Sequence, residues 1–183
     1  MEMFEKMIRG EMYRSDDPTL MQLNLKALTY TIRANLEPSG ALRSEIYREI
    51  LGTTPETFCI CPGFACDYGI NIHLGNHFFA NHNCVMLDVC EIRFGDHCMC
   101  GPNVQIYTAT HPIDPTQRNS GWEYGKPVTI GNNVWLGGSC VILPGVSLGN
   151  NVVVGAGSVV TQSFGDNVVI AGNPAKIIQT NAY

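Results

Sequence analysis

The sequence has no long apolar run and no excess of positive charge. No stretch of its 183 residues is apolar for the length needed to cross a bilayer. Residues 1–6 lack the apolar core and cleavage site of a signal peptide. The net charge of −5 disfavours nucleic acid or an anionic membrane as the main partner. We therefore expect a cytoplasmic protein that binds neither nucleic acid nor membrane.

The cysteine spacing also argues against a structural zinc site. None of the eight cysteines forms the C-x2-C pairs that structural zinc sites use. Disulfides are not expected in a chain with no export signal. No long charged or low-complexity tract divides the chain, so one main domain with a small appendage is expected.

Residues 1–56 have the pattern of a helical segment. Asp16-Asp17-Pro18 is a helix start signal, with acidic caps and proline in the first turn. Ser39 is expected to cap a later helix, and Gly52 to stop it. An amphipathic stripe is expected between these signals, at Leu20, Leu23, Leu28 and Ile32. The segment is expected to pack on the main domain, and a role as a substrate lid is compatible with that.

After Phe58 the pattern changes to a repeat of six. The repeating apolar residues are Ile130, Leu136, Ile142, Leu148, Val154 and Val160. The same frame appears earlier at Leu74, Ala80 and Met86, and after a shift at Phe94, Cys100 and Ile106. A period of six fits neither a helix nor a simple strand, but is typical of a coil of short strands with three repeats per turn. The sequence therefore predicts a mainly β protein, with a parallel β-helix of hexapeptide repeats over residues 57–183.

Five cysteines fall within this repeat. Cys84, Cys90, Cys98 and Cys140 occupy the small inward position, four residues after the apolar one, and Cys100 occupies the apolar position itself. Free cysteine packs as a small hydrophobe, so we expect these five in the core, with metal or redox chemistry as the alternative. Cys59, Cys61 and Cys66 precede the clear repeat and have no assigned role.

Several motifs of the chain are specific, among them "CDYGINIHLGNHFFANHNCVMLDV", "YTATHPIDPTQRNSG" and "AGNPAKII". They resemble the motifs of the maltose and galactoside O-acetyltransferases, with the nodulation-type acetyltransferases as close relatives. The resemblance implies a left-handed coil, a protruding loop near residues 109–128, and a homotrimer with active sites between subunits. It also implies direct acetyl transfer from acetyl-CoA to a sugar hydroxyl, typically the 6-hydroxyl, with no metal required. Maltose, glucose and galactosides are all open as acceptors.

A histidine fits the chemistry of this reaction. A sugar hydroxyl is a very weak acid, so its attack on a thioester needs a base that works near neutral pH. His111 lies where the repeat gives way to the loop, and it matches the catalytic histidine of the family. Asn81 matches the position that stabilises the negative charge on the thioester oxygen. Glu123, in the same loop, is a candidate to orient His111 and to line the acceptor site, although a backbone carbonyl could also orient it.

The resemblance assigns further residues to the two substrates. For the acceptor these are Ser15 or Asp16, Asp67 and Asn81, with Asp88 nearby; Val89 stands where the family has an aspartate. Asp16 could instead serve only as a helix cap. The positions that match coenzyme A contacts are Gly138, Ala156, Thr161, Gln162, Lys176 and Gln179. Gln162 and Gln179 replace basic residues of relatives, so weaker or less salt-dependent binding of coenzyme A is expected.

Two other classes of function are open to the same residues. Three neutral imidazoles can hold a catalytic zinc across a subunit interface, as in β-helix proteins that resemble carbonic anhydrases. His77 and His82 have a suitable spacing, with His73 or His97 as the third ligand. A non-catalytic scaffold is the other alternative, although the presence of His111 and Asn81 argues against it.

Overall fold

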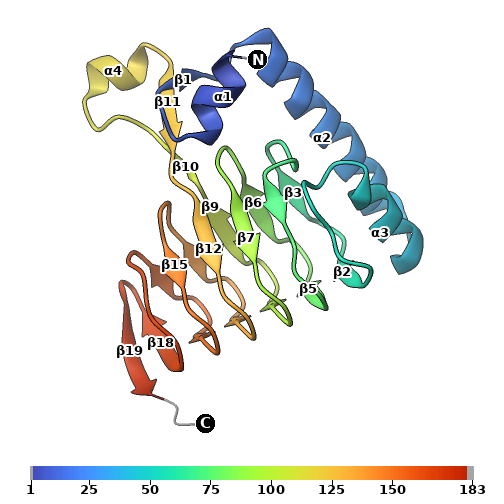
Figure 1. Cartoon of the computed structure of the whole chain (residues 1–183), viewed down its shortest axis with the longest axis vertical. Coiled ribbons are helices and arrows are strands. Elements are labelled where there is room, and N and C mark those ends of the chain that lie inside the picture. The colour runs from blue at the N-terminus through green and yellow to red at the C-terminus, as the bar shows by residue number, and fades with distance from the viewer. Residues whose placement is uncertain (1, 181–183) are drawn as a thin grey trace.

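Three parallel sheets form the faces of a coil that occupies most of the chain (Figure 1). The computed structural model describes residues 2–180. The seven-stranded face contains β2 (Phe58–Ile60), β5 (Phe78–Ala80), β8 (Met99–Cys100), β13 (Trp135–Leu136), β16 (Val153–Val154), β18 (Val168–Gly172) and β19 (Ala175–Thr180). The five-stranded face contains β3 (Ala65–Cys66), β6 (Val85–Leu87), β9 (Gln105–Tyr107), β14 (Val141–Ile142) and β17 (Val159–Val160). The four-stranded face contains β4 (Ile72–His73), β7 (Ile92–Phe94), β12 (Val128–Ile130) and β15 (Ser147–Leu148).

Each strand of these faces pairs in parallel with the strand one coil away, except β18 and β19, which are antiparallel. The repeat residues of neighbouring coils lie in register, as Ile130 with Leu148 and Leu136 with Val154 show. These side chains are 1–2% exposed and belong to one continuous core. The fold class predicted from the period of six is therefore confirmed.

A row of Asn and Asp side chains lies along the corner that joins the four-stranded face to the seven-stranded face, and their spacing in the sequence gives the number of residues in successive coils. In each pair below, the later side chain accepts a hydrogen bond from the backbone N–H of the earlier residue. The pairs are Asn76 to Asp96 (2.7 Å, 20 residues apart), Asp96 to Asn132 (2.8 Å, 36 apart), Asn132 to Asn150 (2.9 Å, 18 apart) and Asn150 to Asp166 (2.7 Å, 16 apart). The expected three repeats of six thus hold for the third pair. The first pair spans a longer coil, and the second spans the coil that contains the protruding loop.

The extra residues enter at the corner that joins the five-stranded face to the four-stranded face, which we call the pocket corner. There the protruding loop forms β10 (Ala109–Thr110), α4 (Pro115–Asn119) and β11 (Trp122–Gly125). The N-terminal strand β1 (Tyr13–Arg14) pairs with β11, and β11 pairs with β10, in an antiparallel sheet. The loop therefore contains a β-hairpin, and strand β1 near the start of the chain pairs with that hairpin.

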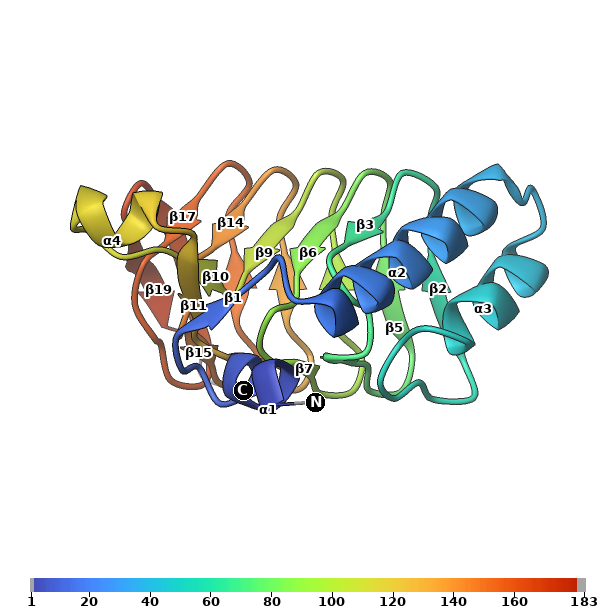
Figure 2. The same ribbon diagram turned by 90° about the horizontal axis from the view of Figure 1, so that it is seen from above.

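Three helices precede the coil: α1 (Glu2–Ile8), α2 (Pro18–Leu36) and α3 (Gly40–Arg48). The two predicted caps are confirmed, because the Asp17 carboxylate accepts from the backbone N–H groups of Thr19 and Leu20, and the Ser39 hydroxyl accepts from that of Leu42. In Figures 1 and 2, α2 and α3 lie at the β2 end of the coil. Within residues 2–180, no helix has the length and apolar character needed to span a membrane.

The apolar stripe predicted for α2 is partly wrong. Leu20 is buried, but Leu28 and Ile32 are 50% and 52% exposed. The buried face contains small residues instead, Ala27, Thr31 and Ala34. Small side chains allow the helix to lie close to the first coil, which leaves the larger apolar side chains on the outer face.

Gly52 does not end α3, which stops at Arg48. A Cβ atom at Gly52 would collide with the backbone oxygen of Ile70 and with the ring of His73. Next to it, Thr53 makes the first parallel bridge of the coil, with His73. The glycine is therefore required by the close approach of two coils and not by the end of a helix.

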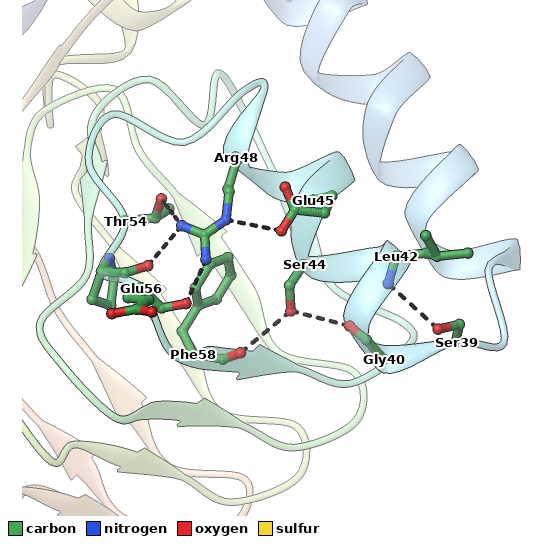
Figure 3. Close-up of polar contacts among 10 residues, drawn as sticks. Ser39, Gly40, Leu42, Ser44, Glu45, Arg48, Thr54, Glu56 and Phe58 are labelled. Carbon is green, nitrogen blue, oxygen red and sulfur yellow. Dashed lines mark hydrogen bonds and ion pairs between the residues drawn. The ribbon is translucent and has the colours of Figure 1, made fainter.

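Arg48 joins the helical segment to the first coil (Figure 3). Its guanidinium donates to the Thr54 hydroxyl at 3.1 Å and to the backbone oxygens of Pro55 and Glu56 at 2.7 Å and 2.6 Å. The same group lies 5.0 Å from the centre of the Phe58 ring. One side chain thus fixes the linker that leads from α3 into β2.

Four of the five repeat cysteines lie in the coil core as predicted: Cys84, Cys98, Cys100 and Cys140. Cys90 is also buried, but it lies in a second cluster beneath α1, where its thiol contacts the backbone oxygen of Met7 at 3.1 Å. Burial raises the pKa of the Cys84 and Cys98 thiols to about 11. These thiols are protonated and poorly nucleophilic near neutral pH, as expected for core residues.

Candidate active site

A pocket of about 370 Å³ opens at the pocket corner, between the coil, α2 and the β10–β11 hairpin. It is lined by Tyr13, Ser15, Met21, Asn24, Asp67, Tyr68, Leu87, Val89, Ala109, His111 and Glu123. Four residues predicted from the sequence, Ser15, Asp67, His111 and Glu123, therefore come together here. They come from the N-terminal segment, the first coil and the protruding loop.

His111 follows β10 directly and is exposed at this pocket. The pairing of Thr110 with Tyr124 places His111 beside Glu123 at the end of the hairpin. On the other side of β11, Glu123 lies opposite Tyr13 of β1. The strand pairing thus brings an imidazole, a carboxylate and a phenol into one pocket, where an imidazole can remove a proton from a bound hydroxyl.

Two carboxylates make the pocket electrostatically unusual. Burial, and secondarily the negative charge of Glu123, raise the pKa of the Asp67 carboxyl to about 6. Burial also raises the pKa of the Tyr13 and Tyr68 phenols, so both stay protonated. The pocket therefore offers acceptors and hydroxyl donors together, a combination that suits a ligand with several hydroxyl groups.

Asp88 lies at the same corner but does not line the pocket. It has no exposed surface, and its carboxylate accepts backbone N–H groups of Asp67, Tyr68 and Asn71 at 3.0, 2.9 and 3.3 Å. A ligand in the pocket cannot reach this carboxylate, so the structure does not place Asp88 with the acceptor contacts expected from the sequence.

Asp16 and Asn81 are also absent from the pocket lining. Asp16 is exposed and forms a bidentate ion pair with Arg14, with N–O distances of 3.0 and 2.7 Å. It does not cap α2, because Asp17 does. Asn81 follows β5, where its side-chain oxygen accepts from the backbone N–H of His82 at 2.8 Å.

Comparisons with known proteins identify the family. A profile described as the maltose acetyltransferase hexapeptide capping motif matches residues 6–55, and one described as the hexapeptide repeat of succinyl-transferase matches residues 127–162. A maltose O-acetyltransferase structure from Clostridium difficile 630 is 46% identical, with a TM-score of 0.97, over 100% of this chain and 99% of that one. Nodulation protein L of Rhizobium meliloti is 46% identical over 94% of this chain and 96% of the relative. A galactoside acetyltransferase structure in complex with coenzyme A is 36% identical, with a TM-score of 0.93, over 98% and 91% of the two chains.

The chain belongs to the maltose and galactoside O-acetyltransferase family. The resemblance drawn from its motifs is therefore confirmed, and the chain is an acetyltransferase. The family's capping motif corresponds to the helical segment α1–α3, and the hexapeptide match begins just before β12.

Two of the residues that the family resemblance assigns to the acetyl donor, Gly138 and Ala156, lie at a different corner from His111. Gly138 and Ala156 occupy the turns between the seven-stranded and five-stranded faces, one coil apart. Asn81 occupies the same corner two coils before Gly138. We call this the donor corner. Thr161 and Gln162 are exposed between β17 and Phe164, which pairs with Leu148 of β15, so they lie at the pocket corner. Lys176 and Gln179 lie on β19 of the seven-stranded face.

The histidines considered for zinc do not converge within the described residues. His77 stacks on His97, with ring centroids 4.7 Å apart, whereas His82 lies beyond β5 next to Asn81. Across residues 2–180, no group of three or more His, Cys, Asp or Glu side chains could hold a metal ion. Family membership favours acetyl transfer over the zinc alternative.

Sequence reasoning missed the pocket contributions of Tyr13, Asn24 and Tyr68. One signal for the corner was present, because the repeat runs eight residues from Met86 to Phe94 instead of six. The additional residues of the first coils lie at the pocket corner, so irregular repeat lengths mark this place. The pairing of β1 with β11 had no such signal, because it joins segments far apart in the sequence.

Proposed function

We propose that this protein transfers acetyl from acetyl-CoA to a hydroxyl group of a sugar, with the 6-hydroxyl of maltose, glucose or a galactoside as the expected target. One observation carries the proposal: His111 shares a polar pocket with Asp67, Glu123 and Ser15 in a chain of this family. In this proposal the reaction needs no metal. The alternative that an activity assay must test is a non-catalytic scaffold.

His111 is proposed as the general base for the acceptor hydroxyl. The imidazole takes the hydroxyl proton as the oxygen attacks the thioester carbon, and a tetrahedral intermediate with a negative oxygen forms. The imidazolium then gives that proton to the departing thiolate as the carbon–sulfur bond breaks. Glu123 lies beside His111 and is the candidate to orient the ring.

Asp67, Glu123 and Ser15 are proposed to bind the hydroxyl groups of the acceptor. Each lines the pocket and provides a short polar side chain. Val89, which is 3% exposed, contributes an apolar wall at the position where the family resemblance leads us to expect an aspartate. Recognition of one particular hydroxyl must therefore come from the other polar groups, because a valine side chain forms no hydrogen bond.

Acetyl-CoA is proposed to lie along the donor corner, past Gly138 and Ala156, with Thr161 and Lys176 as further contacts. Ala156, Thr161 and Lys176 are exposed to solvent, and Gly138 is half-buried. A Cβ atom at Gly138 would lie 3.2 Å from the backbone oxygen of Pro102, so the tight stacking of two coils also favours glycine there. The related galactoside acetyltransferase with bound coenzyme A supports the choice of donor.

A homotrimer is proposed because one subunit keeps the two halves of the reaction apart. His111 and the acceptor pocket lie at the pocket corner, whereas Asn81 and Gly138 lie at the donor corner. Asn81 can stabilise the oxyanion above His111 only if a neighbouring subunit brings its donor corner to this pocket. The proposed active site is therefore shared by two subunits.

The outward side chains of two of the three faces support this assembly. On the seven-stranded face Phe79, Met99, Trp135 and Val153 form one row in register. Met99 and Trp135 are 49% and 51% exposed in the single chain. The matching row on the four-stranded face is polar, with His73, Arg93, Thr129 and Ser147. Apolar outer rows of this kind typically mark protein interfaces, so the seven-stranded face is proposed to meet a neighbour.

The function is tested by incubating the purified protein with acetyl-CoA and a panel of sugars while thiol release is followed. The proposal predicts thiol release that depends on the sugar, a mono-acetylated product, and a mass in solution of three chains. Nuclear magnetic resonance of the product locates the acetylated hydroxyl. Sugar-independent activity that is lost with a chelator and restored by zinc would favour the metalloenzyme instead.

A further inference from the structure

The turn between β3 and β4 is organised around one side chain from the next coil. Its residues Asp67, Tyr68 and Asn71 direct their backbone N–H groups at the Asp88 carboxylate, at distances of 3.0, 2.9 and 3.3 Å. The side-chain amide of Asn71 donates to the backbone oxygen of Asp88 at 2.7 Å. The turn also contains Gly69, whose φ of +72° is a conformation that other residues rarely adopt.

Asp67 is held from a second direction by α2. The side-chain amide of Asn24 donates to the backbone oxygen of Asp67 at 2.8 Å. The N–H of Asp67 is thus fixed by Asp88, and its carbonyl is fixed by Asn24. Both main-chain groups of this residue have partners, and the side chain is left to line the pocket beside His111 and Glu123.

Asp88 itself is in an unfavourable environment for a carboxylate. Burial raises its pKa to about 7, although the backbone hydrogen bonds act in the opposite direction. A buried carboxylate is costly to retain unless its hydrogen bonds serve a defined arrangement. The corner that joins the four-stranded face to the seven-stranded face has side chains in the same role. There Asp96, Asn132 and Asn150 accept backbone N–H groups, and all three are at the surface or half-buried. The pocket corner instead uses an acid with no exposed surface.

We propose that Asp88 is a positioning residue of the acceptor site, which fixes the main chain of Asp67 so that the Asp67 carboxyl points into the pocket. This inference rests on the proposed function, because it takes the pocket to be the acceptor site. Asp88 touches neither substrate. Its effect on the reaction passes through the turn at residues 67–71 and therefore concerns the acceptor and not acetyl-CoA.

The test compares Asp88→Asn with Asp96→Asn in the full-length protein. Both substitutions change a carboxylate that accepts a backbone N–H from the preceding coil, but Asp96 lies outside the pocket lining. In Asp88→Asn the new amide nitrogen faces the N–H of Asn71, so the turn loses one acceptor. We expect the KM for the sugar to rise about tenfold, the scale of one lost buried hydrogen bond, while the KM for acetyl-CoA stays within about twofold. Asp96→Asn should change neither KM.

A second variant covers the case in which Asp88→Asn does not fold. Asn71→Ala removes only the donor to the Asp88 backbone oxygen and should raise the KM for the sugar in the same direction, by a smaller factor. An unchanged sugar KM in the folded Asp88→Asn or Asn71→Ala protein overturns the inference, as does an equal change in the KM of both substrates.

Asp67→Asn separates this inference from the proposed function. If Asp67→Asn raises the KM for the sugar and Asp88→Asn does not, the inference alone is wrong. If Asp67→Asn also leaves the sugar KM unchanged, the pocket is not the acceptor site and the residue assignments of the proposed function are wrong as well.

Discussion

Tyr13 lies opposite Glu123 in the antiparallel pairing of β1 with β11. This contact joins the first residues of the chain to a hairpin more than a hundred positions later, and both side chains line the pocket that contains His111. The N-terminal segment is thus part of the candidate active site as well as a cap for the end of the coil.

Arg14 secures this pairing, so its removal should affect the reaction. Its guanidinium donates to the backbone oxygen of Ser120 at 3.0 Å and lies 5.9 Å from the centre of the Trp122 ring. Arg14→Ala should lower kcat/KM for the sugar by about two- to tenfold, the size of one lost hydrogen bond. Steady-state kinetics check this, with Arg9→Ala as the control, because Arg9 pairs only with exposed Glu11 among the described contacts. Equal rates for both variants would mean that the Arg14 side chain is not needed to hold the hairpin.

The raised pKa of Asp67 predicts a specific dependence of stability on pH. Its pKa is about 6 in the folded protein against an ordinary value of 3.8. Between these values the folded state binds more protons than the unfolded state, so the contribution of Asp67 is present below about pH 4 and is lost as the pH rises through 6. Asp67→Asn removes this loss. Its free energy of unfolding relative to the unsubstituted protein should increase between about pH 4 and pH 7.5, by on the order of 1 kcal/mol in urea titrations. A difference that stays constant with pH would contradict the raised pKa.

Close stacking of the coils predicts that alanine substitution lowers stability at one glycine and hardly changes it at another. A Cβ atom at Gly137 would lie 2.6 Å from the backbone N of Ala156 and the backbone O of Val154, and neither atom can move without disturbing a strand. Gly137→Ala should destabilise the protein by about 1–3 kcal/mol in chemical denaturation, the usual cost of overpacking. The control is Gly165→Ala, where no atom outside the adjoining residues of the chain lies within 4 Å of the added carbon, and it should change stability by less than about 0.5 kcal/mol. Similar losses in both variants would contradict the steric explanation.

Much of the fold follows from local sequence signals. The period of six predicts the coil, and Asp17 and Ser39 act as the expected helix caps. The outer face of α2 could not be predicted in this way, because large apolar residues occur on both sides of the helix and only packing selects the small ones. The role of Gly52 and the separate cluster around Cys90 likewise depend on which segments meet in space.

The candidate site likewise contains residues that the sequence predicts correctly and one whose position only the structure reveals. The sequence predicts His111, Asp67, Glu123 and Ser15 as site residues, and they share one pocket. It also offers Asp88 as a possible acceptor contact, but the structure buries this residue under the turn that carries Asp67. Sequence spacing cannot distinguish a carboxylate that faces the pocket from one that faces the backbone beneath it, since both belong to the same corner.

The central claim is that His111 is the base that activates the acceptor, and one comparison tests it most directly. His111→Ala and the control His97→Ala, an exposed histidine outside the pocket, are assayed for thiol release from acetyl-CoA at a saturating concentration of the best sugar. His111→Ala should lower kcat by about 10²- to 10⁴-fold while its coenzyme A binding and its mass in solution are unchanged, and His97→Ala should keep the full rate. A His111→Ala protein that turns over at the unsubstituted rate would contradict the account.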